Sequence, residues 1–245
     1  MSALLSLQGV GKRYRRGELT RWLLRGVTLH LDAGEVVSVV AMRSQGKTTL
    51  LRIAAGMMAP DEGLVLLGRE DLSGLSDPAH SRLLREQVGW AGRGGPGLGV
   101  PMLDYVALRL AIGGRTRRRE VRSFALAALK RVGMEHSAER RWEDLSDWER
   151  ALVELAQAIA GGPRLLLIDD LIDGLGARET EEVALLVRAL ARELGMGVLM
   201  AVSDPEAALC SHRVLSLAAG RLSVMAGEEE SGNVIDLARR RLRGL

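Results

Sequence analysis

The sequence predicts an α/β fold, in which a parallel sheet holds a phosphate-binding loop, an antiparallel β-rich segment precedes that loop and a helical lobe is inserted later. Three observations predict it. An apolar run at residues 35–40 leads directly into Gly-Lys-Thr-Thr at 46–49. A second run, residues 164–170, is apolar until it ends in two carboxylates, which is typical of a strand buried on both faces of a parallel sheet. Between them, residues 102–160 have a helical pattern with no clear strand.

The segment before the loop is predicted to be rich in strands. Residues 4–10 are expected to form one strand. Residues 27–32 alternate apolar and polar side chains, the period of a half-buried strand. Residues 12–17, which are mostly basic, are expected to form a loop, and residues 32–34 a turn. The first strands are therefore expected to be antiparallel.

The rest of the chain alternates helices and strands. We expect a helix over residues 48–58 that ends near Gly56, a turn at 59–63, a strand at 64–67, a helix at 78–86, a strand at 88–91 and a glycine-rich stretch at 92–99. After the helical lobe we expect a helix at 179–194, a strand at 198–202, a short helix at 205–209 and a hairpin of 213–217 with 222–225 around Gly220. This alternation places the phosphate loop at the carboxyl edge of a sheet.

The stretch from Ala41 to Thr49 carries the chemistry of phosphate binding. Backbone N–H groups of such a loop point inward, and the helix that follows presents its positive N-terminus. Lys47 is expected to reach the terminal phosphates and the Thr48 hydroxyl to ligate Mg²⁺. The expected binding residues are Ala41, Arg43, Ser44, Gln45, Gly46, Lys47, Thr48 and Thr49. The alternative is a chance Gly-Lys-Thr-Thr in a strand-to-helix turn.

Composition limits the other classes of function. The 245 residues carry a formal net charge of +3, which does not by itself imply nucleic acid, and aromatic residues, at 3%, are too few for a base-stacking platform. Cys210 is the only cysteine, so an internal disulfide and a cysteine-clustered zinc site are excluded. No run approaches the roughly 18 apolar residues of a membrane span, and the N-terminus lacks a secretory pattern.

Five separated stretches, in order, resemble the ATP-binding subunits of ABC transporters, above all the efflux and lipoprotein-release group. They are GVGKRYRRGELTRWLLRGVTLHLDAGEVVSVV, GKTTLLRIAAGMMAPDEGLVLLGRED, LLREQVGWAGR, LLLIDDLIDGL and SHRVLSLAAGRL. The resemblance implies a P-loop NTPase (RecA-like) core with an N-terminal antiparallel β subdomain and an inserted α-helical subdomain. It implies one ATPase domain at residues 1–227, with the lobe at about 93–160, followed by a linker and basic helix at 228–245.

Two residues match family positions in full. By this resemblance Tyr14 stacks on adenine, and Asp169 holds Mg²⁺ through water. A surface tyrosine and a carboxylate that caps a strand end are the alternatives. The cofactors implied are therefore ATP and Mg²⁺.

Other family positions carry different residues here. Asp170 replaces the glutamate that polarises the attacking water, Arg93 replaces a glutamine and Ser203 replaces a histidine that contacts the γ-phosphate. The family's Leu-Ser-Gly-Gly signature appears as Leu-Ser-Asp-Trp at 145–148, in which Ser146 is kept, and Gly176 replaces a further aspartate. The loop itself departs at Ala41 and Ser44, where the family favours glycine. A non-glycine residue forced to positive φ costs on the order of 1–3 kcal/mol, so we expect strain or an altered path there.

These departures predict that nucleotide binding is retained while hydrolysis is weak. The resemblance also implies a second ABC ATPase subunit, in a homodimer or a heterodimer, and a membrane permease that docks near Arg93, so the expected location is the cytoplasmic face of the membrane. The alternative is a catalytically silent clamp or regulatory subunit beside an active ATPase. The family's DNA-repair members and two-cassette translation factors fit less well, since the chain is short, carries one cassette and lacks zinc cysteines. No nucleic-acid partner is therefore expected.

Overall fold

The computed structural model describes residues 3–16, 19–112 and 118–227, and the predicted linker and basic helix at 228–245 lie outside them. The strands are β1 (Leu5–Arg16), β2 (Leu19–Leu31), β3 (Val36–Val40), β4 (Glu62–Leu67), β5 (Glu70–Asp71), β6 (Val88–Gly92), β7 (Leu165–Asp169), β8 (Gly197–Val202), β9 (Arg213–Ala218) and β10 (Arg221–Gly227). The helices are α1 (Lys47–Ala54), α2 (Asp77–Gln87), α3 (Met102–Ile112), α4 (Arg118–Arg131), α5 (Asp147–Ile159) and α6 (Ala177–Leu194). Short 3₁₀ helices lie at Leu72–Gly74, Glu135–Ser137, Trp142–Asp144 and Pro205–Ala208.

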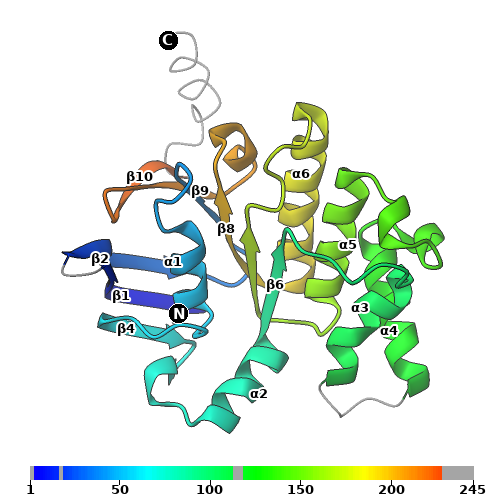
Figure 1. The fold of residues 1–245 in the computed structure, drawn as a ribbon, viewed down its shortest axis with the longest axis horizontal. Helices are drawn as coiled ribbons and strands as arrows, with labels where there is room; N and C mark the ends of the chain where they lie inside the picture. The colour runs from blue at the N-terminus through cyan, green and yellow to red at the C-terminus, as the bar shows by residue number, and fades with distance from the viewer. Residues whose placement is uncertain (1–2, 17–18, 113–117, 228–245) are drawn as a thin grey trace.

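The larger sheet confirms the predicted α/β class. Its strand order is β10-β9-β3-β8-β7-β6, and every neighbouring pair is parallel except β9 with β10. Strands β3 and β8 are buried along their whole length, as expected for strands covered on both faces. The carboxyl ends of β3, β6, β7 and β8 therefore meet at one edge of the sheet, where the predicted phosphate loop follows β3 (Figure 1).

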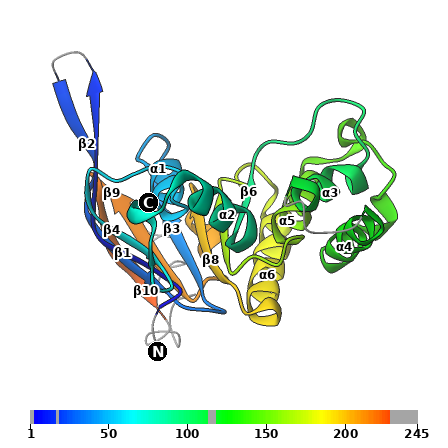
Figure 2. The same ribbon diagram turned by 90° about the horizontal axis from the view of Figure 1, so that it is seen from below.

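Alternate side chains of each strand enter two separate cores. Val37 and Val39 of β3 face α1 and the smaller antiparallel sheet, together with Leu165 and Leu167 of β7. The intervening residues of the same strands face α5, α6 and the helices beyond them. The period of two along a strand thus builds a three-layered molecule, with the larger sheet in the middle (Figures 1 and 2).

The smaller sheet has the order β2-β1-β4-β5 and is antiparallel, as predicted for the N-terminal segment. The predicted loop at residues 12–17 was wrong, because β1 continues as a strand to Arg16 and pairs with β2 in a long hairpin that projects from the body (Figure 2). The Arg13 guanidinium lies over the Trp22 ring, 4.3 Å from its centre. Such cross-strand pairs stabilise the projecting end of the hairpin, where residues 12–15 and 20–23 are exposed or only partly buried, so basic composition alone did not reveal it.

The lobe beyond β6 is helical, as its pattern predicted. Helices α3, α4 and α5 pack on one another around a buried apolar core (Figure 1). Ser146 caps α5 in a full capping box, since its hydroxyl accepts from the Glu149 N–H and the Glu149 carboxylate accepts from the Ser146 N–H. The polar residues at 146 and 149 thus fix where this helix begins.

Several element boundaries differ from the sequence-based prediction: β2 and β4 begin earlier than expected, at Leu19 and Glu62, and α6 begins at Ala177. Helix α1 ends at Ala54, since Gly56 turns the chain with φ of 76°. The short helix expected at 205–209 is a single 3₁₀ turn, Pro205–Ala208. Within the described ranges, no helix is both long and apolar enough to cross a bilayer.

Candidate functional site

The phosphate loop lies between the end of β3 and the start of α1. Gly46 is the N-cap of α1 and has φ of 101°, and a Cβ there would lie 3.0 Å from Cγ of Leu23. A glycine is therefore required at position 46 both by the backbone and by the space available. Ser44 has φ of 63°, in the left-handed region, where a side chain strains the backbone. The expected strain at Ser44 is therefore present. Ala41 is not among the residues with positive φ.

Lys47 is buried, and three groups hold its ammonium. The Nζ atom donates to the Ala41 carbonyl at 2.8 Å and to Oγ of Ser203 at 2.8 Å, and it lies 3.2 Å from Oδ1 of Asp170. A buried ammonium requires such compensation because burial removes its hydration. The lysine is thus fixed by the strand ends of β3, β7 and β8, at the sheet edge where phosphates are expected.

Asp170 occupies a strained position directly after β7. Its φ is 48°, and its N–H donates to the Ala201 carbonyl at 3.1 Å. Burial raises the pKa of Asp170, and the nearby Lys47 opposes that rise. The carboxylate therefore acts as the counter-ion of Lys47 in this structure, and a non-glycine residue in this backbone region is typical of functional sites.

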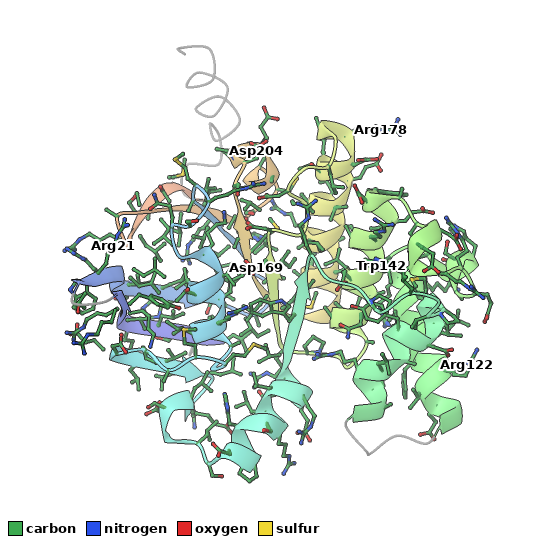
Figure 3. All side chains as sticks on the ribbon, in the orientation of Figure 1. Arg21, Arg122, Trp142, Asp169, Arg178 and Asp204 are labelled. Carbon is green, nitrogen blue, oxygen red and sulfur yellow. The ribbon has the colours of Figure 1, made fainter. Side chains whose placement is uncertain are left out.

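Thr48 and Asp169 form the part of the site that suits a metal ion. The Thr48 hydroxyl donates to Oδ1 of Asp169 at 3.0 Å, and Asp169 lies near the centre of the molecule (Figure 3). Burial raises the pKa of Asp169, so a cation beside it would relieve the cost of its charge. A hydroxyl and a carboxylate fit Mg²⁺, which completes its shell with waters and substrate phosphates. No three His, Cys, Asp or Glu side chains gather as metal ligands within the described residues.

A cavity of about 390 Å³ opens over these groups. Its lining includes Ser44, Gly46, Lys47, Thr48, Thr49, Asp170, Arg43 and Arg93, all predicted site residues. Sequence reasoning missed two further members, Leu23 and Asp173. Asp173 accepts a hydrogen bond from the Ser203 N–H at 3.1 Å and so fixes the residue that holds Lys47. The third carboxylate in the run Asp-Asp-Leu-Ile-Asp was the available signal for Asp173, whereas nothing in the sequence pointed to Leu23.

Six predicted site residues do not line this cavity: Tyr14, Ala41, Gln45, Ser146, Asp169 and Ser203. Ala41 and Ser203 accept from Lys47 and Asp169 accepts from Thr48, so these three lie directly beside it. Tyr14 is on the β1–β2 hairpin, 46% exposed, and its hydroxyl donates to the sulfur of Met58 at 3.8 Å. Gln45 lines a neighbouring cavity that includes Arg21. Ser146 begins α5 in the helical lobe and does not line the phosphate cavity of its own chain. The roles of these residues toward a nucleotide stay predictions.

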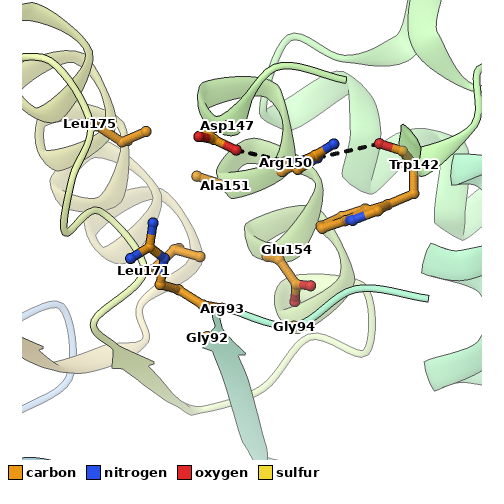
Figure 4. Close-up of a pocket in the computed structure, with 10 residues that line it drawn as sticks. All are labelled: Gly92, Arg93, Gly94, Trp142, Asp147, Arg150, Ala151, Glu154, Leu171 and Leu175. Carbon is orange, nitrogen blue, oxygen red and sulfur yellow. Dashed lines mark hydrogen bonds and ion pairs between the residues drawn. The ribbon is translucent and has the colours of Figure 1, made fainter. Parts of the chain in front are cut away.

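A second cavity, of about 230 Å³, lies between the segment after β6, helix α5 and the segment after β7 (Figure 4). Glu154 lines it and is 5% exposed, and the Tyr105 hydroxyl donates to Oε1 of Glu154 at 2.9 Å. Burial raises the pKa of Glu154 to about 7. Arg93 also lines this cavity, so it borders both cavities, and its side chain points away from Glu154 (Figure 4).

Known proteins share both the sequence and this architecture. The family model for ABC transporters matches residues 24–172. A "Lipoprotein-releasing system ATP-binding protein LolD" of Cereibacter sphaeroides is 37% identical over 91% of this chain and 100% of its own length. The protein of the same name from Granulibacter bethesdensis is 34% identical over 90% of this chain and 96% of its own length.

Solved structures agree with the sequence comparison. The structure of the ATP-binding cassette MJ0796, a dimer in a post-hydrolysis state bound to ADP and Pi, matches with a TM-score of 0.81 and 26% identity, over 91% of this chain and 99% of that one. The fold of cbiO1 from Clostridium perfringens matches with a TM-score of 0.84 over 98% of this chain and 94% of its own. The family match, the LolD-like sequences and the shared fold, together with the loop built on Gly46 and Lys47, agree: the chain belongs to the ABC transporter family, as an ATP-binding subunit similar to LolD.

Proposed function

We propose that this subunit binds MgATP in the cavity over Lys47 and hydrolyses it weakly, so that it drives or regulates a membrane permease mainly through nucleotide binding. The observation that carries the proposal is the ion pair between Lys47 and Asp170. The contact holds the Lys47 ammonium at the place where a phosphate would bind. It also holds the Asp170 carboxylate, which is expected to activate water, against the lysine.

The proposed binding of MgATP rests on the phosphate loop and the residues beside it. The N-terminus of α1, which begins at Lys47, supplies N–H groups and a positive helix end for the phosphates. Thr48 and Asp169 would hold Mg²⁺, which neutralises charge on the phosphate oxygens when it is bound. Lys47 would exchange its contact with Asp170 for the terminal phosphate, so part of the binding energy is spent on separating this pair.

Weak hydrolysis is proposed because the polar groups expected to act on water and the γ-phosphate already contact Lys47. Hydrolysis requires that a water attack the γ-phosphorus, lose a proton and release ADP. Among the predicted catalytic residues, only Asp170 could accept the proton that the water loses. Its carboxylate is instead paired with Lys47. Ser203 is likewise bonded to Lys47, and its short side chain reaches less far than a histidine. Misplacement of a catalytic group by about 1 Å can cost on the order of a hundredfold in rate.

The start of α5 supports a second candidate, a clamp or regulatory subunit beside an active ATPase. In this family two subunits face head to tail, and the signature of one closes on the nucleotide of the other. Here the Ser146 hydroxyl is used by the capping box, and the Asp147 carboxylate, 3.1 Å from Nη1 of Arg150, adds negative charge at this helix start. Trp148 adds bulk. An N-terminus of this kind would close poorly over the phosphates bound by a second subunit. This favours pairing with a different subunit whose own signature is intact.

The remaining parts of the proposal concern partners. The cavity beside Arg93 is where a permease segment is expected to dock, which would hold the subunit at the cytoplasmic face of the membrane. The LolD relatives are named for a lipoprotein-releasing system, and we take a system of that kind as the candidate for this chain.

Binding and turnover measured on the same purified chain test the proposal. We expect calorimetry to detect MgATP binding in the wild type and its loss in Lys47→Ala, while phosphate release stays near the background of the Lys47→Ala variant. Arg122→Gln, which removes a positive charge from the distant helical lobe (Figure 3), is the control and should bind as the wild type does. Rapid turnover by the wild type would contradict weak hydrolysis, and no binding at millimolar ATP would contradict the proposed function altogether.

A further inference from the structure

Three cationic side chains border the phosphate cavity, although the loop chemistry requires only Lys47. The other two are Arg43, on the phosphate loop itself, and Arg93, on the segment after β6. Two carboxylates, Asp170 and Asp173, share the cavity. Asp170 pairs with Lys47, whereas Asp173 accepts from the Ser203 N–H and keeps its negative charge. The three cations of the lining therefore exceed its two carboxylates by one charge.

Among residues 3–16, 19–112 and 118–227, neither arginine has a counter-ion. Both are exposed, and within the described part of the chain no hydrogen bond or ion pair joins either guanidinium to another residue. Arg140 and Arg213 show the contrast, since each lies against a glutamate. Two uncompensated guanidinium groups at the mouth of one cavity create a positive field that favours an anion. The planar fork of an arginine matches phosphate oxygens in a bidentate manner.

The two arginines lie near the place expected for the outermost phosphate of a bound nucleotide. Arg43 also borders the space beside Ser203, Asp173 and Asp204. From the other side, a terminal nitrogen of Arg93 lies 3.6 Å from where a Cβ on Gly174 would stand. The two residues thus flank the region beyond Lys47 and Ser203, where the outermost phosphate is expected, rather than the start of α1, where the inner phosphates lie.

We propose that Arg43 and Arg93 bind the outermost phosphate of a nucleoside triphosphate from the same chain that supplies the phosphate loop. A single subunit then distinguishes the triphosphate from the diphosphate before any second subunit closes on it. The inference rests on the proposed nucleotide site and adds to it two specificity-determining residues and a mode of binding that needs no partner.

The test compares a triphosphate with a diphosphate on the full chain. Two probes are used, each with Mg²⁺: ADP, and the non-hydrolysable β,γ-imido analogue of ATP. Each is titrated calorimetrically into the wild type, Arg43→Gln, Arg93→Gln and the double variant. We expect each single variant to weaken the triphosphate analogue about fivefold to tenfold, in line with one charge-assisted contact, and ADP less than twofold. Arg93→Lys should recover part of the loss, because it restores charge without the fork. Arg122→Gln is the matched control for a lost positive charge, and light scattering after titration reports the oligomeric state.

The outcomes separate this inference from the proposed function. Unchanged discrimination in the double variant, with both nucleotides still bound, overturns the inference and leaves nucleotide binding intact. Triphosphate affinity that rises with protein concentration as dimers form also overturns it, since the selectivity would then come from the second subunit. If neither nucleotide binds the wild type, the proposed function fails, and the inference fails with it.

Discussion

Lys47 and Asp170 lie 3.2 Å apart, Nζ to Oδ1, and the lysine side chain is 4% exposed. The pair therefore stands at the sheet edge where a nucleotide phosphate would compete for the lysine. Because an anion beside the phosphate site repels the ligand, Asp170 limits affinity while it compensates the buried lysine in the absence of nucleotide.

Replacing Asp170 by Asn should strengthen nucleotide binding and weaken the fold. We expect MgATP affinity to rise by about threefold to tenfold, because Lys47 no longer has to leave a carboxylate. The free energy of unfolding should fall by about 1–3 kcal/mol, since a buried ammonium loses its counter-ion. Calorimetry and urea unfolding measure the two effects. Asp104→Asn, in the helical lobe, should change neither by as much, and unchanged affinity in Asp170→Asn would rule out competition at Lys47.

Replacing Ser44 by Gly should relieve backbone strain in the phosphate loop. Ser44 has φ of 63°, and a glycine there should raise the free energy of unfolding by about 1 kcal/mol. Ala219, with φ of 49°, offers a matched control outside the phosphate cavity. Ala219→Gly should stabilise the fold similarly and leave nucleotide affinity unchanged. A loss of stability in Ser44→Gly would show that the serine side chain contributes more than its strain costs.

Substitutions of Ser146 test its role as the cap of helix α5. The Ser146 hydroxyl accepts from the Glu149 N–H at 3.2 Å, so Ser146→Ala should lower the free energy of unfolding by about 1 kcal/mol. Ser146→Asp should restore most of that stability, because aspartate caps helices about as well. Thermal unfolding of both variants tests this role. If the aspartate variant is no more stable than the alanine variant, the capping account is wrong.

The pH dependence of stability should change when Glu154 is replaced by Gln. Burial raises the pKa of Glu154 to about 7 from an ordinary value of 4.5, so the folded state keeps a proton that the unfolded state loses. The stability that this proton contributes is complete below pH 4.5 and is lost as the pH rises toward 7. The charged groups that line its cavity are Arg93, Arg150 and Asp147.

Glu154→Gln keeps an acceptor for the Tyr105 hydroxyl but cannot be charged. The variant should therefore be more stable than the wild type at pH 8, by on the order of 1–3 kcal/mol, and this advantage should shrink toward pH 5. Denaturant unfolding at a series of pH values measures it. A constant difference between the two proteins across this range would show that Glu154 does not titrate with a raised pKa.

Much of the fold could be predicted from the periodicity of the sequence. The apolar runs gave the buried strands β3 and β7 because burial on both faces leaves a continuous signal. The projecting end of the β1–β2 hairpin was missed because its stabilising contacts, such as Arg13 on Trp22, join residues that look like an ordinary basic loop when read singly. Helix α1 was predicted too long because apolar residues continue beyond its last turn, where Gly56 reverses the chain.

The candidate site was predictable to a similar degree. Lys47 and Thr48 follow from the spacing of the phosphate loop and Asp169 from the family resemblance, and the structure brings Asp169 to the Thr48 hydroxyl. That Asp170 pairs with Lys47 could not be predicted, since it depends on a left-handed backbone at position 170. Glu154 was also missed, because a glutamate in an amphipathic helix reads as exposed until its neighbours are placed in space.

The rate of ATP hydrolysis by the wild type and by Asp170→Glu, measured as phosphate release at saturating MgATP, tests whether the ion pair of Lys47 with Asp170 suppresses hydrolysis. The added methylene would let the carboxylate extend past Lys47 toward the attacking water. We expect a wild-type rate near the background of Lys47→Ala and a rate at least tenfold higher in Asp170→Glu. A wild-type rate well above background that Asp170→Glu leaves unchanged or lowers would contradict this suppression, because the native aspartate would then already position the water.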